Sequence, residues 1–180
     1  NPLTFAHTLV INGNSVTDLV IPVETTLINQ FAFSGCNITS VTIPSDVWNI
    51  DQYAFLDCLN LETVYFNATS CYMGGAVFRS CTNLRTVVIG ESVQSINSAA
   101  FAHCHSLDTV FLKPTTPPYV ALSNSYPAGA FDDNAPNRVF VLSGCSYEDY
   151  YNSSYWIPYR SSLRDPIIDI TVNASSSNTQ

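Results

Sequence analysis

The chain has 180 residues, of which only 11% are charged, and its 14 acidic and 6 basic side chains give a net charge of −8. Six cations cannot form the basic stripe that displaces phosphate counterions, which excludes nucleic-acid binding and argues against docking on anionic lipid. With 46% hydrophobic residues a folded core is expected, but no run of 18 apolar residues is available for membrane insertion.

The first predicted element is a β-hairpin within residues 1–16. Asn12-Gly13 is a strong signal for a tight two-residue turn, and it lies between the apolar residues 9–11 and Val16. Because the last strand of a sheet exposes unpaired backbone groups, we expect this hairpin to cover the N-terminal face of the structure that follows.

Apolar residues recur at steps of 22 or 23 over residues 17–142. Four columns share these steps, and they comprise Ile28, Ile50, Met73 and Ile96; Phe33, Phe55, Phe78 and Phe101; Cys36, Cys58, Cys81 and Cys104; and Ile21, Ile43, Phe66, Ile89 and Leu112. A unit of ~23 residues cannot bury its apolar side alone. We therefore expect about five repeats of 22–23 residues, stacked with their strands in a parallel sheet.

The second repeat shows the parts of each unit. Residues 41–43 alternate between apolar and polar, which indicates a strand, and Pro44 ends it because proline cannot donate a ladder hydrogen bond. A second, shorter extended piece follows. Asp51, like Asn29 and Asn97, lies where a helix cap is favoured, so the Ala-Phe-x-x-Cys segment is predicted to form one or two helical turns.

The third repeat is degenerate in two places. Asn67 stands where the second repeat has a proline, and Gly74-Gly75 stands where the other repeats have polar side chains.

The fifth repeat carries an insertion, since Phe101 and Phe131 are 30 residues apart. The inserted stretch is stiff and non-helical because it contains Pro114, Pro117, Pro118 and Pro127. A tolerated loop is the favoured interpretation. The alternative is a binding loop that uses Tyr119 and Tyr126 as contacts.

The C-terminal part predicts a cap and one further strand. Residues 143–164 contain two amphipathic helical pieces, 147–151 and 156–159. Residues 165–180 contain a terminal strand, whose Ile168, Ile170 and Val172 share one face, and a polar tail. This strand is expected either to fold back onto its own sheet or cap, or to add to the edge of a neighbouring subunit and so build a fibre.

Two phrases, VTIPSDVWNIDQYAFLDCLNLETV and VVIGESVQSINSAAFAHCHSLDTV, resemble the BspA-type leucine-rich repeats of bacterial and protist surface proteins. The resemblance extends from about Leu9 to Leu163. The opening LVINGNSVTDLVIP is similar to the hairpin that commonly precedes such repeats, and RVFVLSGCSYEDYYNSSYWIPYRSSL is similar to their usual ending. The resemblance implies an α/β leucine-rich-repeat solenoid at the cell surface or outside the cell, and it implies no ligand.

The reactive side chains predict little chemistry. The four cysteines of the column are expected to be free buried thiols, because the resembling family has a similar cysteine column that serves packing. Stacked neighbours would nevertheless lie within disulfide range. His103 and His105 flank Cys104, which should point inward, so a metal site is not expected. Residues 132–134 lack the ligand spacing of a calcium loop. No catalytic or phosphate-binding motif occurs, so we expect neither an enzyme nor a cofactor.

Strand residues between the core positions should face outward. One outward column is polar and comprises Asp18, Ser40, Thr63, Thr86 and Thr109. The next is mostly apolar and comprises Val20, Thr42, Tyr65, Val88, Phe111 and Phe140. Such a stripe usually marks an interaction surface, although β-propensity alone also favours these residues. We expect a protein or glycan partner to contact Tyr65, Val88, Phe111 and Phe140.

Four N-x-S/T sequons are candidate glycosylation sites in a eukaryotic secretory route, and they lie at Asn37, Asn67, Asn152 and Asn173. The sequence as a whole predicts a non-catalytic extracellular or cell-surface binding and adhesion module that uses its strand face. The alternative is a structural subunit of an extracellular fibre, assembled end to end through terminal strands.

Overall fold

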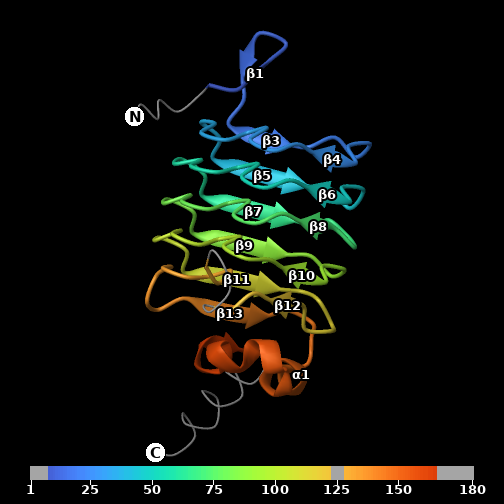
Figure 1. Cartoon of the computed structure of the whole chain (residues 1–180), viewed down its shortest axis with the longest axis vertical. Coiled ribbons are helices and arrows are strands. Elements are labelled where there is room, and N and C mark those ends of the chain that lie inside the picture. Colours follow the sequence, from blue (N-terminus) through green and yellow to red (C-terminus); the bar gives the residue numbers. More distant parts are fainter. Residues whose placement is uncertain (1–7, 123–127, 166–180) are drawn as a thin grey trace, which may run out of the picture.

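The computed structural model describes residues 8–122 and 128–165. In them the chain winds into coils that stack along one axis, with the N-terminal hairpin at one end and a helical segment at the other (Figure 1). The predicted solenoid is confirmed. Tyr126, Asn173 and the proposed assembly strand with Ile168, Ile170 and Val172 lie outside the described residues.

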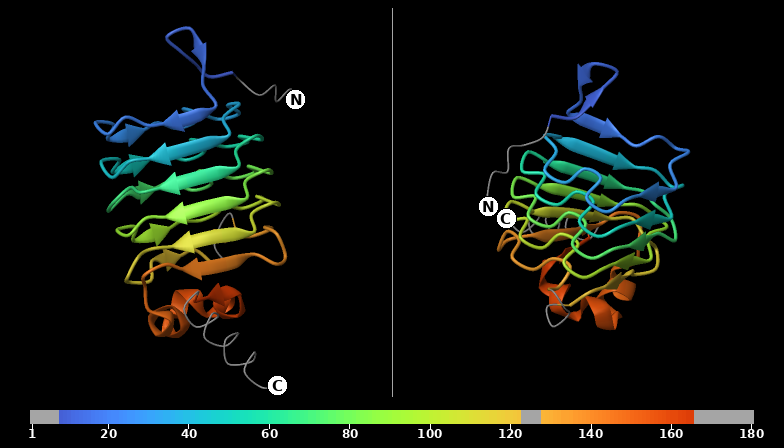
Figure 2. Two further views of the ribbon diagram at one scale, coloured as in Figure 1. Left: turned by 180° about the vertical axis from the view of Figure 1, so that it is seen from behind. Right: turned by 45° about the horizontal axis from the view of Figure 1, so that its top comes forward.

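Each coil contributes one strand to a parallel sheet, and β14 of the C-terminal segment completes it, so that the described chain has seven strands in the order β14-β13-β11-β9-β7-β5-β3. These strands are β3 (Asp18–Val20), β5 (Ser40–Ile43), β7 (Thr63–Phe66), β9 (Thr86–Ile89), β11 (Thr109–Leu112), β13 (Val139–Leu142) and β14 (Leu163–Arg164). Each strand pairs with the strand of the next coil, so the repeat order in sequence is also the order in space (Figure 2).

A second row of shorter strands runs along an adjacent side of the coils. They are β4 (Leu27–Ile28), β6 (Asn49–Ile50), β8 (Tyr72–Met73), β10 (Ser95–Ile96) and β12 (Tyr119–Val120), paired in parallel as β4-β6-β8 and β10-β12. Alternate residues of both rows point into one continuous core, as their period of two requires. Val41, Ile43, Ile50 and their counterparts in the central repeats have no exposed surface.

The Ala-Phe-x-x-Cys segments form turns, so the prediction of helical turns is wrong. Two positions in these segments take left-handed backbone conformations coil after coil: Phe31, Tyr53, Ala76 and Ala99 at the first, and Gly35, Asp57, Ser80, His103 and Asp133 at the second. The amides between them donate to the neighbouring coil, for example from Phe55 N–H to the Val77 carbonyl at 2.9 Å. A helix would direct these amides within the segment instead.

The polar residues expected to cap those helices have another role. The Asn97 side chain donates to the Met73 carbonyl of the preceding coil at 2.5 Å. The Asn49 side chain donates to Asp51 at 3.0 Å. These side chains therefore support the contact between coils, or the bend within one coil, and they cap no helix.

Five phenylalanine rings stack through the core, from Phe33 through Phe55, Phe78 and Phe101 to Phe131. Successive centroids are 5.0, 5.0, 5.3 and 5.5 Å apart, and neighbouring planes differ by 13° or less. At this distance the offset rings contribute beyond the area that they bury. The stack ends where Phe140 meets Phe131 edge-on, at 5.1 Å and 76°.

The cysteine column lies beside this stack as four free, buried thiols, in agreement with the sequence. The thiol of each later cysteine donates to the carbonyl of the phenylalanine in the preceding coil. The Sγ–O distance is 3.1 Å from Cys58 to Phe33, 3.3 Å from Cys81 to Phe55 and 3.2 Å from Cys104 to Phe78. In the next coil Asn134 takes the cysteine position, and its amide reaches the Phe101 carbonyl at 2.8 Å.

The N-terminal hairpin forms as expected, from β1 (Val10–Ile11) and β2 (Asn14–Ser15), but it does not extend the main sheet. Its strands are exposed and pair only with each other among the described residues, while Leu9 and Val16 pack against the core. The hairpin therefore leaves the edge of β3 uncovered, contrary to the expectation that it shields this edge. Figure 1 shows it standing beyond the first coil.

The C-terminal cap consists of α1 (Tyr147–Asn152), a 3-10 helix at Ser154–Ser162 and β14. None of the described helices is long and apolar enough to cross a membrane. The buried Tyr150 and Trp156 close the core, and each donates to the proline-rich stretch: Tyr150 to the Pro114 carbonyl and Trp156 to the Pro118 carbonyl, both at 2.9 Å. Pro114 and Pro118 of the fifth repeat thus hold the cap in place through their carbonyls.

The phenylalanine stack predicts where the solenoid is most sensitive. Phe78→Ala should lower the free energy of unfolding by roughly 3–5 kcal/mol, because it removes a buried ring with a neighbour on each side. Phe33→Ala is the matched control. Its ring is only partly buried and has one stacking neighbour, so its cost should be smaller. Urea denaturation measures both, and a cost below about 1 kcal/mol for Phe78→Ala would contradict the stack.

The buried thiols of the cysteine column predict how stability changes with pH. Burial, and next the neighbouring thiols of Cys104 and Cys58, raise the pKa of Cys81 well above its usual value. The unfolded chain ionises its thiols from about pH 8.5 and then holds fewer protons than the folded chain. The melting temperature should therefore fall as the pH rises above that value, and Cys81→Ala should weaken this dependence.

Maleimide labelling gives a second measurement of the same cysteine column. The native protein should leave Cys58, Cys81 and Cys104 unlabelled at neutral pH, whereas the unreduced, denatured chain should label all six cysteines. Each disulfide would lower that count by two. A count of two or fewer would therefore show that the cysteine column is linked by disulfides and does not consist of free thiols.

Candidate functional site

The main sheet presents two outward columns on its solvent side. The first is polar, and its members pair across strands as Asp18, Ser40, Thr63, Thr86, Thr109 and Val139. The Ser40 hydroxyl donates to the Asp18 carboxylate at 2.8 Å, and the Thr109 hydroxyl donates to Asp108 at 2.7 Å. This column offers a row of hydroxyls with an acidic residue at one end.

The second outward column is mostly apolar, and we call it the apolar stripe. It consists of Val20, Thr42, Tyr65, Val88, Phe111 and Val141, paired across six strands. Val20 is 68% exposed and Tyr65 is 44% exposed, while the other four are partly exposed. The structure thus brings together three of the expected contact residues, Tyr65, Val88 and Phe111.

Phe140 does not belong to the apolar stripe, and its assignment as a contact residue is wrong. It pairs with Val110, has no exposed surface and lies against Trp156 at 5.2 Å. The neighbouring Val141 takes the outward position. A shift of one residue moves a strand side chain to the opposite face, and the insertion in the fifth repeat hid this shift.

Val141 in the apolar stripe and Arg164 beside its end were not expected from the sequence. Val141 pairs with Arg164 of β14, an exposed cation whose guanidinium donates to the Ser161 carbonyl at 2.8 Å. The spacing of 30 residues between Phe101 and Phe131, applied to Phe111, gives Val141. Arg164 had no such signal, because its strand lies beyond the last repeat.

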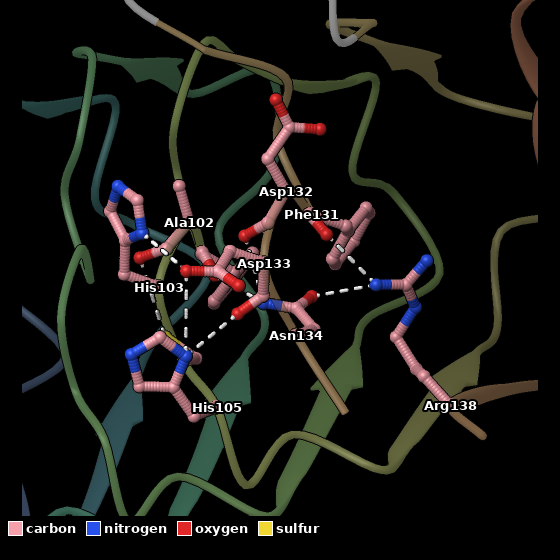
Figure 3. Close-up of polar contacts among 10 residues, drawn as sticks. Ala102, His103, His105, Phe131, Asp132, Asp133, Asn134 and Arg138 are labelled. Carbon is pink, nitrogen blue, oxygen red and sulfur yellow. Dashed lines mark hydrogen bonds and ion pairs between the residues drawn. The ribbon is translucent and has the colours of Figure 1, made fainter. Parts of the chain in front are cut away.

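The two histidines meet an aspartate across the turns of neighbouring coils (Figure 3). His103 Nδ1 lies 2.9 Å from Asp133 Oδ2, and His105 Nδ1 lies 3.1 Å from the Asp133 carbonyl. The hydrogen bond to His103 lowers the pKa of the Asp133 carboxyl. Cys104 points away into the core, and within the described residues no group of three potential metal ligands is arranged to hold an ion.

Arg138 closes the other side of this region, also in Figure 3. Its guanidinium donates to the Phe131 carbonyl at 2.9 Å and to the Asn134 side chain at 2.8 Å. It also lies 4.8 Å from the Phe140 ring centroid and 5.5 Å from that of Tyr159. A cation over these rings connects the last coil to the cap, so its role is structural.

The remaining candidate residues lie apart from the strand face. Tyr119 is 41% exposed on β12, where its ring meets Tyr155 edge-on at 5.0 Å. Of the sequons, Asn67 and Asn152 are exposed, whereas Asn37 is partly buried and its side-chain oxygen accepts a hydrogen bond from Asn60. The structure places no two of these residues in a common site.

The coils, the two rows of parallel strands and the cap define a leucine-rich-repeat solenoid. A family model described as a BspA type leucine rich repeat region matches residues 10–119 in 6 copies. The chain belongs to this BspA-type leucine-rich-repeat family. None of the curated proteins compared with the chain matches it.

Solved structures similar to this chain include the following two. The T. pallidum leucine rich repeat protein is 29% identical with a TM-score of 0.54, over 71% of this chain and 56% of that one. A leucine rich cell surface protein from Faecalibacterium prausnitzii A2-165 is 21% identical with a TM-score of 0.57, over 77% of this chain and 38% of that one. The chain therefore spans little more than half of the first and well under half of the second.

Proposed function

We propose that this domain is a non-catalytic module, at a cell surface or outside the cell, that binds a protein partner through the apolar stripe. The location is proposed because the BspA-type family suggests a surface setting and because the similar protein from Faecalibacterium prausnitzii is described as a cell surface protein. The stripe itself is the observation that carries the binding role. A mostly apolar row of side chains that runs over six strands and remains at least partly exposed is typical of an interaction surface.

The chemistry of the strand face fits a protein better than a sugar. Its backbone groups are paired within the sheet, so a partner meets only side chains. Tyr65 and Phe111 supply rigid ring area, the kind that dominates binding energy at protein interfaces, and the threonine column beside them supplies a polar border. A glycan partner remains an outcome of the test.

The size of the face predicts a weak or transient contact. Two outward columns over six strands present twelve side chains. A stable interface uses about 20–30 residues on each side. The partner should therefore also reach the turns beside the sheet, or bind several such modules at once.

The double variant Tyr65→Ser and Phe111→Ser tests this role. Binding of the labelled domain to cultured mammalian or bacterial cells should weaken by about tenfold or more, because two ring contacts are lost. The melting temperature should change little, since both side chains face solvent. The matched control is Tyr151→Ser, which removes an equally exposed tyrosine from the cap.

Mild protease treatment of those cells identifies the partner's class. Loss of binding supports a protein, whereas loss after glycosidase treatment alone assigns the face to a glycan. Unchanged binding by the double variant would remove the stripe from the site. Unfolding of the double variant would show that these residues belong to the core.

A second candidate function, a subunit of an end-to-end fibre, is favoured by the N-terminal end. Within the described residues β3 pairs only with β5, so its outer edge is free to accept another strand. Exposed apolar side chains gather on the same coil, at Val20, Val23, Leu27 and Phe31, which are 68%, 61%, 40% and 51% exposed. The sequence alternation of Ile168, Ile170 and Val172 makes residues 166–180 the candidate for that added strand.

Deletion of residues 166–180 tests the fibre. The full chain should form filaments visible by negative-stain microscopy, while the shortened chain should stay folded and elute as a monomer in size-exclusion chromatography. If both forms are monomers and the deletion only lowers the melting temperature, the segment is an internal cap. The fibre function would then be abandoned.

A further inference from the structure

A groove lies on the side of the solenoid that carries the shorter strands, between them and the turns, and away from the apolar stripe. It has a volume of about 480 Å³ and crosses four successive coils, from Gln52 and Tyr53 to Tyr119. We infer that this groove binds an extended, neutral oligosaccharide. The inference does not depend on the strand face, because none of the stripe residues lines the groove.

The third repeat has two glycines where the other repeats have polar side chains, and one of them, Gly75, lines the groove. Gly74 is required by packing, since a Cβ there would lie 2.5 Å from the Gln52 backbone nitrogen. Gly75 is not required in this way. Its Cβ would meet only the Ser98 carbonyl, at an ordinary 3.5 Å, and its φ lies outside the left-handed region.

A side chain at position 75 would fill the hollow without straining the backbone. The first and second repeats have Gln30 and Gln52 at the equivalent position, and the fourth repeat has Ser98. Neither packing nor conformation therefore accounts for Gly75, whereas keeping the groove open does. Gly74 is thus explained by packing, whereas Gly75 is explained by the open groove.

Tyrosine rings flank the opening at a regular spacing. Tyr72, 64% exposed, and Tyr119, 41% exposed, occupy the same outward column of the shorter strands, with the small Ser95 between them. Two strand spacings place them on the order of 10 Å apart along the axis. Tyr155 meets the Tyr119 ring edge-on at 5.0 Å, and Phe31 stacks on Tyr53 at 5.3 Å, so two of the three tyrosines at the groove have a neighbouring ring that limits their motion.

The chemistry of the lining selects a neutral sugar. The negative face of an aromatic ring attracts the C–H groups on the face of a pyranose, and the two spaced rings suit a chain that presents such a face at intervals. The amide of Gln52 and the side chain of Asn97 offer donors and acceptors of the kind that hydroxyls need. None of the described residues that line the groove has a charged side chain, and the net charge of −8 disfavours acidic glycans.

Saturation-transfer NMR with the full chain tests the groove. The probes are short β-1,4-linked chains of glucose, mannose, galactose or N-acetylglucosamine, with a sulfated oligosaccharide as the charged comparison. At least one neutral chain should bind with a Kd between about 1 μM and 1 mM. Gly75→Gln should weaken this binding by about tenfold or more while leaving the melting temperature unchanged.

Ring variants separate stacking from folding. Tyr72→Ser should weaken binding by about tenfold, and Tyr72→Phe should retain most of it because the ring remains. Tyr65→Ser, an equally simple change on the strand face, is the matched control and should leave sugar binding unchanged. Loss of cell binding by the strand-face variant with intact sugar binding would show that the two surfaces act separately.

Three outcomes would overturn the inference. The first is that no neutral chain binds with a Kd below about 10 mM. The second is that Gly75→Gln, folded as judged by its melting temperature, binds as well as the native protein. The third is that the sulfated probe binds better than every neutral one.

Discussion

Backbone hydrogen bonds between neighbouring coils run along three sides of this solenoid: the main sheet, the shorter strands and the turns. The third row explains the unusual backbone. Residues such as Tyr53 and Asp57 take left-handed conformations, which cost about 1–2 kcal/mol each in an L-residue. Hydrogen bonds offset that cost, because the alternating amides then pair with the next coil instead of remaining unsatisfied in a buried turn. The phenylalanine stack and the cysteine column follow from the same register, since coils that match in backbone also match in side chains.

Because each coil forms its hydrogen bonds with the next coil, the two ends of the stack need contacts of a different kind. At the C-terminal end the column residues change their chemistry: Asn134 replaces a cysteine but keeps its hydrogen bond, and Phe140 meets the ring stack edge-on. Arg138 then ties the last coil to the rings of the cap. The other end has no such closure among the described residues. Its exposed valines are consistent with an interface at that end.

The spacing of residues was sufficient to predict the parallel stack, the core columns and the cap, because a period of 22 or 23 carries its register from one repeat to the next. It failed where the partner of a group lies in another coil. The turn segments look helical locally, yet their amides pair across coils. Phe140 was placed outward because the insertion interrupts the count that leads to Val141. The groove was not foreseen either: Gly74-Gly75 read as a lapse in the repeat, and only the packing around each glycine distinguishes the two.

Because each coil is bonded to the next in the same way, the stack has a defined response to a pulling force. The two described ends of the chain leave from opposite ends of the stack (Figure 1). A pull on them would peel the outermost coil bond by bond, while the deeper coils keep the hydrogen bonds that join them to one another. Each coil of 22 or 23 residues that is released in this way adds about 75 Å of extended chain. Such a domain would lengthen in steps under load and shorten again when the load is removed, behaving as a reserve of tether length.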